Sequence, residues 1–266
     1  MFDSIAGDYD ALNHILSLDV DKIWRKKALK QIVDAPAPVQ VLDLACGTGD
    51  FSIAIAKALS RSHKRVGTPI EAHVKAPAKA PVEAQVTSTG FVTGDSGRSD
   101  LMTKGHVTGV DLSEGMLAVM REKVAKAGLT EMISIEEGDG ENLRFPDNTF
   151  DRVTIAFGIR NFEDRPKGLR EMLRVLKPGG RLVILELSRP ENKVIRWFYD
   201  LYFLHILPKI GGKVSGDKAA YAYLPASVAA FPGKKAFMAT MREAGFRTVT
   251  HKAFTLGICR MYTGEK

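Results

Sequence analysis

Two glycines flank a threonine in the stretch VLDLACGTGDF, which runs from residue 41 to residue 51. The apolar residues before the glycines are typical of a strand buried on both faces, and those after them have helical spacing. Gly47 and Gly49 permit the backbone angles of a tight turn and let a ligand lie against the main chain. A strand, a glycine turn and a helix in this order predict a nucleotide-type site, although a purely structural turn would need the same glycines.

The acidic residues beside this turn indicate which ligand it takes. A dinucleotide fingerprint has a third glycine three residues after the second, but Ser52 occupies that position. Asp43 and Asp50 flank the turn, and two carboxylates would repel a pyrophosphate. They suit a ligand that carries an ammonium and a sulfonium group. The stretch therefore predicts S-adenosylmethionine as the ligand, with Asp43, Gly47 and Gly49 at its site.

Two more aspartates lie at the ends of the next two predicted strands. Asp111 lies near the end of HVTGVDL (106–112), where nucleotide sites of this type have an acidic residue that binds the ribose hydroxyls. Asp139 follows the strand 133–137 and could accept a hydrogen bond from an adenine amino group, with a simple turn aspartate as the alternative. The ribose residue is expected about 20 residues after the glycines, and removing the insertion described below restores that spacing.

An arginine and an asparagine follow the fourth predicted strand, FDRVTIAF (150–157). The ligand crevice of an open α/β sheet lies beyond the carboxyl ends of its strands. Arg160 and Asn161 are therefore expected where a methyl acceptor meets the donor. An ordinary surface ion pair is the alternative for Arg160.

The elements that must position these residues alternate along the chain. Helical spacing, a capping Ser113 and a helix-starting Pro166 predict helices between the strands. This alternation predicts a parallel sheet with helices on both faces, which is a Rossmann-like α/β fold. The predicted strands are 41–44, 106–112, 133–137, 150–157, 181–187, 247–254 and 258–262, and the predicted helices are 51–59, 114–127, 166–176 and 234–244.

Helical apolar spacing also precedes this fold, and residues 1–35 are interpreted as a helical N-terminal cap. As a cap over the active site, the segment would place Tyr9, Asp10, Asn13 and Trp24 against the substrate. A packing arm on the core is the alternative, and the residues alone favour it.

Two segments interrupt the alternation of strands and helices. Residues 62–104 are rich in Ala, Pro, Val, Thr and Gly without a lasting period, which is typical of a long, flexible surface insertion. Residues 190–233 are interpreted as a lid on the substrate side. Their aromatic part, 195–207, could form a buried helix, line an apolar pocket or lie at a membrane interface.

The composition suits a single domain. The 266 residues are 45% hydrophobic, enough for a substantial core. No apolar run is long enough to span a membrane and the first residues lack a signal-peptide pattern, so a cytoplasmic protein is expected. Two cysteines do not make a disulfide framework or a zinc site, and no metal is expected. The net charge of +7 permits an anionic partner, nucleic acid or membrane, without choosing between them.

Longer motifs extend these observations over nearly the whole chain except the insertion. GTGD and LKPGG are shared by many methyltransferases, whereas the N-terminal YD–N–WR pattern, FGIRN and AYAYLPAS are more particular. With these motifs the chain resembles the class I S-adenosylmethionine-dependent methyltransferases that C-methylate the quinone ring in ubiquinone and menaquinone biosynthesis. The resemblance implies a seven-stranded, mostly parallel sheet with an antiparallel last strand. It implies donor contacts at Thr48, Asp111, Asp139 and Gly140, a catalytic pair of Arg160 and Asn161, and substrate contacts at Tyr9, Asn13, Trp24 and Tyr221.

The activity that the resemblance implies is C-methylation of a polyprenyl quinol. Demethylmenaquinol is the favoured acceptor, and 2-polyprenyl-6-methoxy-1,4-benzoquinol is a second one. Arg160 would stabilise the phenolate or orient a water, Asn161 would position the ring, and Asp10 or a water held by carboxylates would act as the base.

The prenyl tail of such an acceptor implies peripheral contact with the inner face of the cytoplasmic membrane. Nucleic acid is not expected as a partner, and a homo-oligomer is allowed. Two alternatives stay open, because the fold does not fix the acceptor. One is methylation of RNA or of another small molecule, and the other is a non-catalytic donor-binding scaffold.

Overall fold

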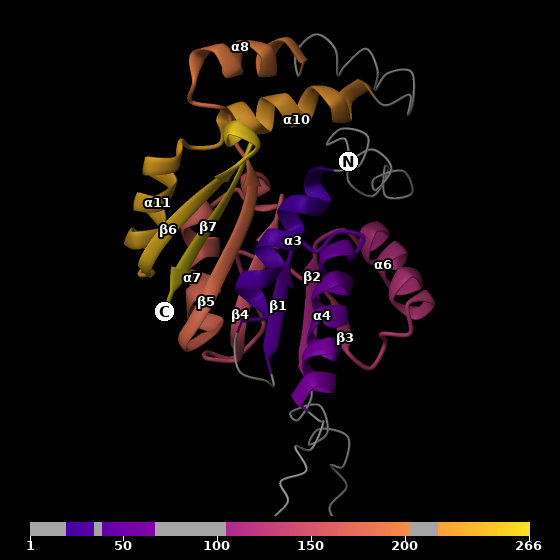
Figure 1. Ribbon diagram of the computed structural model, residues 1–266. Helices are drawn as coiled ribbons and strands as arrows, with labels where there is room; N and C mark the ends of the chain where they lie inside the picture. Colours follow the sequence, from indigo (N-terminus) through magenta and orange to yellow (C-terminus); the bar gives the residue numbers. More distant parts are fainter. Residues whose placement is uncertain (1–19, 35–38, 67–104, 203–217) are drawn as a thin grey trace, which may run out of the picture.

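One seven-stranded sheet forms the centre of the molecule (Figure 1). The computed structural model describes residues 20–34, 39–66, 105–202 and 218–266, without the side chains of 62–66 and 218–222. The strand order is β3-β2-β1-β4-β5-β7-β6, and only β7 runs antiparallel to its neighbours. The predicted mostly parallel sheet is thus confirmed. Its strands are β1 (Gln40–Leu44), β2 (His106–Asp111), β3 (Ile133–Glu137), β4 (Phe150–Ala156), β5 (Leu176–Leu187), β6 (Arg247–Phe254) and β7 (Cys259–Glu265).

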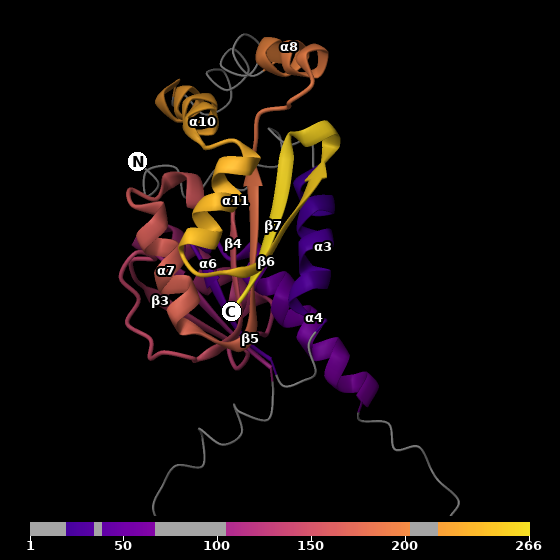
Figure 2. The same cartoon turned by 90° about the vertical axis from the view of Figure 1, so that its left-hand side faces the viewer.

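Helices cover both faces of this sheet, which gives three layers (Figures 1 and 2). One face carries α3 (Val20–Ile32), α4 (Asp50–Val66) and α6 (Glu114–Lys126), and the other carries α7 (Arg165–Val175) and α11 (Lys234–Glu243). An apolar core lies between the sheet and each helix layer. In β1, Val41 packs into the core on the α3, α4 and α6 side, whereas Leu42 and Leu44 pack into the core on the α7 and α11 side. Strands buried on both faces read as continuous apolar runs, as the sequence predicted.

Several element boundaries differ from their predicted positions. Helix α4 continues to Val66, so the first five residues of the predicted insertion 62–104 belong to that helix, and residues 67–104 lie outside the described residues. Strand β5 begins at Leu176 rather than at residue 181, because the LKPGG segment joins the strand through a shift in its pairing with β4. Gly179 permits this path with a φ of +74°.

Two further helices lie beyond the carboxyl ends of the parallel strands (Figures 1 and 2). They are α8 (Lys193–Leu201) and α10 (Lys218–Ala230), and α10 packs against a short 3-10 turn, η1 (Ile159–Asn161), that follows β4. A second such turn, η3 (Thr255–Gly257), links β6 to β7. Within the described part of the chain, none of the helices has the length and apolar character needed to cross a membrane.

Candidate active site

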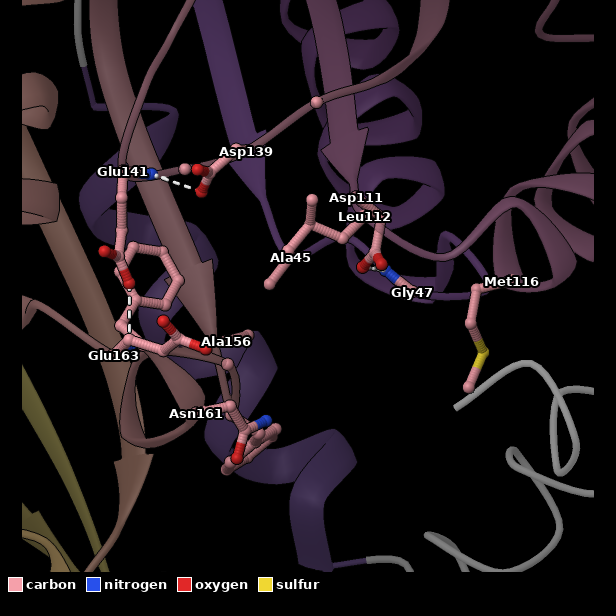
Figure 3. A pocket seen from close by; sticks show the side chains of 15 residues that line it. Ala45, Gly47, Asp111, Leu112, Met116, Asp139, Glu141, Ala156, Asn161 and Glu163 are labelled. Carbon is pink, nitrogen blue, oxygen red and sulfur yellow. Dashed lines mark hydrogen bonds between the residues drawn. The ribbon is translucent and has the colours of Figure 1, made fainter. Parts of the chain in front are cut away.

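A pocket of about 330 Å³ opens at the carboxyl ends of β1, β2, β3 and β4 (Figure 3). We call it the strand-end pocket. This is the edge at which open α/β sheets bind ligands. It is lined by Ala45, Gly47, Asp111, Leu112, Met116, Gly138, Asp139, Gly140, Glu141, Ala156, Phe157, Gly158, Asn161, Phe162 and Glu163.

The glycine turn beside β1 has the left-handed backbone that its sequence suggested. Gly47 has a φ of +55° and Gly49 a φ of +83°. A Cβ on Gly49 would overlap the Met120 side chain, which packs under the turn. The second glycine is therefore required by both its backbone angle and the close approach of α6.

Two residues that are not glycine share this left-handed conformation at the pocket. Ala45 follows β1 with a φ of +49°, and Phe157 follows β4 with a φ of +62°. Both line the strand-end pocket. Such angles are uncommon for residues with a side chain and collect at functional sites. They carry no signal in the sequence, because the tertiary structure imposes them.

The two predicted strand-end aspartates reach the same pocket. Asp111 accepts hydrogen bonds from the backbone N–H of Gly47 (2.8 Å) and of Ser113 (2.9 Å), so its carboxylate ties the ends of β1 and β2 together. Asp139 accepts from the N–H of Glu141 at 2.8 Å, which is the turn geometry weighed as its alternative. Asp139 also lines the pocket. The turn geometry is therefore compatible with the predicted position of this carboxylate at the ligand site.

Two glutamates that the sequence interpretation missed add acidity to this pocket. The Glu141 carboxylate accepts from the backbone N–H of Glu163 at 2.7 Å and of Asp164 at 3.1 Å (Figure 3). It thereby joins the loop after β3 to the loop after η1. Both glutamates line the pocket, so four carboxylates with Asp111 and Asp139 surround it. A strongly acidic lining favours a cationic ligand over a pyrophosphate.

Asp43 and Asp50, which flank the glycine turn, were both expected to face a cationic ligand, but the structure compensates one carboxylate and buries the other. Asp50 forms an ion pair with Lys123 of α6, so its charge is compensated. Asp43 is 1% exposed and accepts a hydrogen bond from the Ser52 hydroxyl at 2.6 Å. Burial raises the pKa of Asp43 to about 7, against the lowering effects of the Ser52 hydrogen bond and of Arg25.

A second cavity of about 30 Å³ adjoins the first and shares Ala45, Gly47, Ala156 and Phe157 with it. We call it the turn pocket. Asp43 and Thr48 line it, together with Arg25 of α3, which lies over the Phe157 ring at 5.5 Å. An arginine and a buried carboxyl side by side match the carboxylate and ammonium of an amino acid. Arg25 was not among the predicted site residues, although it belongs to the N-terminal WR motif, because nothing in the sequence placed it beside Asp43.

The predicted acceptor residue Arg160 lies behind the pocket wall. Its guanidinium side chain is 7% exposed and pairs with the fully buried Glu186 of β5, Nη1 to Oε1, at 2.8 Å. The other Glu186 oxygen accepts the Arg160 backbone N–H at 3.1 Å, and Arg160 Nη1 also donates to the Phe157 carbonyl. Glu186 therefore contacts both the backbone and the side chain of Arg160 in η1. The sequence analysis missed Glu186. It could have been identified as a charged residue inside the apolar run RLVILEL.

Asn161 is the member of the predicted pair that lines the strand-end pocket. Its Oδ1 accepts a hydrogen bond at 2.9 Å from the hydroxyl of Tyr223, which lies on α10. This contact joins residues 62 positions apart. Tyr223 belongs to the AYAYLPAS motif, in which Tyr221 was the predicted substrate contact. The Tyr221 side chain lies outside the described residues.

Trp24 lies in the core and is absent from the lining of either pocket. It is 5% exposed, its indole N–H donates to the Thr255 hydroxyl at 2.9 Å, and its ring lies 6.2 Å from that of Phe157. This placement favours the packing interpretation of the N-terminal segment over a direct substrate contact. Tyr9, Asp10 and Asn13 lie outside the described residues. Among the residues that are described, no three metal-ligating side chains gather into a cluster.

Solved structures with a similar architecture include SAM-dependent methyltransferases. A SAM-dependent methyltransferase from Aquifex aeolicus aligns with a TM-score of 0.53 at 19% identity over 90% of this chain and 88% of its own. One from Thermotoga maritima aligns with a TM-score of 0.57 at 16% identity, over 100% and 98% of the two chains. At this identity the likeness concerns the fold. The architecture is the class I fold of S-adenosylmethionine-dependent methyltransferases.

Sequence comparison narrows the class to a family. The chain belongs to the ubiE/COQ5 methyltransferase family, whose model matches residues 1–266. A relative from Bacteroides fragilis, named demethylmenaquinone methyltransferase, is 40% identical over 100% of this chain and 91% of its own length. A relative from Geobacter sulfurreducens, named ubiquinone/menaquinone biosynthesis C-methyltransferase UbiE, is 44% identical over 100% of this chain and 87% of its own. The resemblance inferred from the motifs is thereby confirmed.

Proposed function

We propose that this protein transfers a methyl group from S-adenosylmethionine to a ring carbon of a polyprenyl quinol, with demethylmenaquinol as the main acceptor. The benzoquinol precursor of ubiquinone is the second acceptor. The observation that carries the proposal is the strand-end pocket, because one cavity brings together acidic groups suited to a cationic donor and the amide of Asn161. The names of the two relatives above support the choice of a quinol.

The residues of the chain fit the donor in two places. Asp111 and Asp139 would hold the ribose and the adenine in the strand-end pocket, beside the bare backbone of Gly47 and Gly140. Asp43, Thr48 and Arg25 would hold the amino-acid end in the turn pocket. When bound, S-adenosylmethionine supplies an electrophilic methyl group on a sulfonium.

The acceptor end requires alignment and charge stabilisation rather than a covalent step on the protein. Asn161 would contact the quinol directly, with its amide oriented by Tyr223. Arg160, paired with Glu186, would act mainly as a positioning residue for this turn. Stabilisation of the phenolate by the arginine is the alternative role. Asp10, or a water held by Glu141 and Glu163, is the candidate base.

Purified protein, S-adenosylmethionine and a demethylmenaquinol with a short tail provide the direct test. We expect a product heavier by one CH2 unit, because the methyl group replaces a ring hydrogen that leaves as a proton. Asn161→Ala should reduce turnover much more than donor affinity. Matched reactions with the benzoquinol and with RNA assign the acceptor. Donor binding without any methylated product would instead support a scaffold.

Arg160→Lys and Arg160→Ala separate the two roles of the arginine. A lysine retains the charge but lacks the planar guanidinium that contacts both Glu186 and the Phe157 carbonyl. Loss of activity in both variants supports positioning, whereas activity in the lysine variant alone supports charge stabilisation of the phenolate.

The prenyl tail places the acceptor in a bilayer. Peripheral contact of the protein with the cytoplasmic face of a membrane is therefore part of the proposal, and it is consistent with the net charge of +7.

A further inference from the structure

Helix α8 presents its apolar residues to solvent. Val194, Trp197, Phe198 and Leu201 are 66%, 61%, 60% and 39% exposed. They are spaced i, i+3, i+4 and i+7, which places them on one face of the helix. These are four of the seven large hydrophobic side chains that are exposed in the described part of the chain, so the apolar surface is concentrated on this helix. We call these four residues the α8 stripe.

The orientation of the stripe is set by the rest of the helix. Asn192 caps it by accepting the N–H groups of Val194 and Ile195 at 2.9 and 3.2 Å. Arg196 donates back to the Pro190 carbonyl at 2.8 Å, and Asp200 accepts from Arg189 at 3.1 Å. Tyr199, between the stripe positions, is only 8% exposed and faces the protein. These polar contacts leave the apolar face outward.

The position of the helix relates the stripe to the site. Helix α8 lies beyond the carboxyl ends of the strands, at the same end of the molecule as α10 (Figures 1 and 2). Helix α10 carries Tyr223, which holds Asn161 at the pocket. A surface that contacts α8 therefore lies at the acceptor end of the molecule.

We propose that the α8 stripe inserts into the interfacial layer of an anionic phospholipid bilayer. This deepens the proposed function, because it names the surface through which a lipid-borne acceptor would be met. Tryptophan and phenylalanine with a neighbouring cation are the residues that the water–lipid boundary favours, and Lys193 is exposed at the first position of the helix.

A second copy of the chain is the less suitable occupant. A stable interface buries roughly 800 Å² on each partner, and four side chains on a helix of nine residues offer much less. The surplus of basic residues in the chain also disfavours self-association and favours an anionic surface.

The chain contains its own probe for this contact. It has two tryptophans, and Trp24 is 5% exposed in the core, so a change in polarity on binding must report Trp197. With vesicles of phosphatidylcholine and phosphatidylglycerol we expect a blue shift of the emission and quenching by lipids brominated on their acyl chains. Trp197→Phe should abolish the signal yet still float with the vesicles. Wild-type emission that ignores the vesicles would overturn the proposal.

Flotation compares the stripe with a matched surface. Trp197→Ser/Phe198→Ser should lose co-migration with anionic vesicles, while Ile23→Ser, at a side chain that is 53% exposed on α3, should not. All three positions are exposed, so the unfolding midpoints should match that of the wild type. Equal flotation of both variants contradicts the inference, and so does a wild type that dimerises through the stripe instead of floating.

Two acceptors keep this inference separate from the proposed function. The double variant should methylate a short, water-soluble acceptor at the wild-type rate and lose turnover of a long-chain acceptor in vesicles. If the wild type methylates the short acceptor but does not bind vesicles, the proposed membrane surface is wrong and the proposed function stands. Vesicle binding without turnover of either acceptor overturns the proposed function alone.

Discussion

The two ends of the strand-end pocket are built in different ways. At the proposed donor end, the Asp111 carboxylate is held by backbone groups, because it accepts the N–H groups of Gly47 and Ser113. At the acceptor end, Arg160 and Asn161 depend on side chains from β5 and α10 that are 26 and 62 positions away. Contacts to backbone N–H groups do not depend on which side chains those residues carry, whereas contacts between two side chains change when either residue changes. The proposed acceptor end can therefore differ among proteins of one fold.

The strongest test removes the carboxylate behind the acceptor end. Glu186→Ala leaves the Arg160 guanidinium buried beside an empty space, and breaking a buried pair costs about 3–5 kcal/mol of unfolding free energy. Urea unfolding measures this loss, and methyl transfer should fall with it. Glu186→Gln, which keeps one acceptor oxygen, should lose less. A Glu186→Ala variant that unfolds like the wild type would show that the turn does not depend on the pair.

The matching test at the donor end adds one methyl group to the turn. Gly49→Ala combines a left-handed angle with overlap against Met120, and we expect a cost of about 2–4 kcal/mol with weakened donor binding. Gly128→Ala is the control, because Gly128 has a φ of +65° with nothing within 4 Å of an added Cβ. Unfolding and calorimetric titration with the donor should separate the two variants. Equal donor affinity in both would mean that the close approach of Met120 has no role in the site.

The raised pKa of Asp43 gives the donor end a pH dependence. Burial raises this pKa from 3.8 to about 7, so the folded protein keeps a proton that the unfolded chain releases. Stability should therefore fall, relative to Asp43→Asn, by up to about 1.4 kcal/mol per pH unit as the pH rises through that window, and level off above it. Unfolding of both proteins at a series of pH values measures the difference. Parallel stability curves would mean that Asp43 is already ionised at low pH.

The smallest expected effect concerns one hydroxyl. Tyr223→Phe removes the hydrogen bond to Asn161, worth about 0.5–1.5 kcal/mol, and should lower turnover while leaving donor affinity unchanged. Tyr262→Phe is the control, because its buried hydroxyl lacks a hydrogen-bond partner in the described part of the chain, and its removal should be neutral or stabilising. If both variants methylate at the wild-type rate, α10 does not orient the acceptor end.

The amino-acid sequence alone determined the sheet, the glycine turn and the acidic strand ends, because periodicity, turn chemistry and strand-end position are local properties. Asp111 lies near the end of a predicted strand, and Asp139 and Asn161 follow one closely. That position was enough to predict all three at the strand-end edge, where they line the pocket. The tertiary structure alone decided which charges act there. It compensated Asp50 with Lys123, buried Asp43 and raised its pKa, paired Arg160 with Glu186, and turned the apolar side of α8 outward. Charge and exposure depend on neighbours that are distant in sequence, and so does the solvation that sets a pKa.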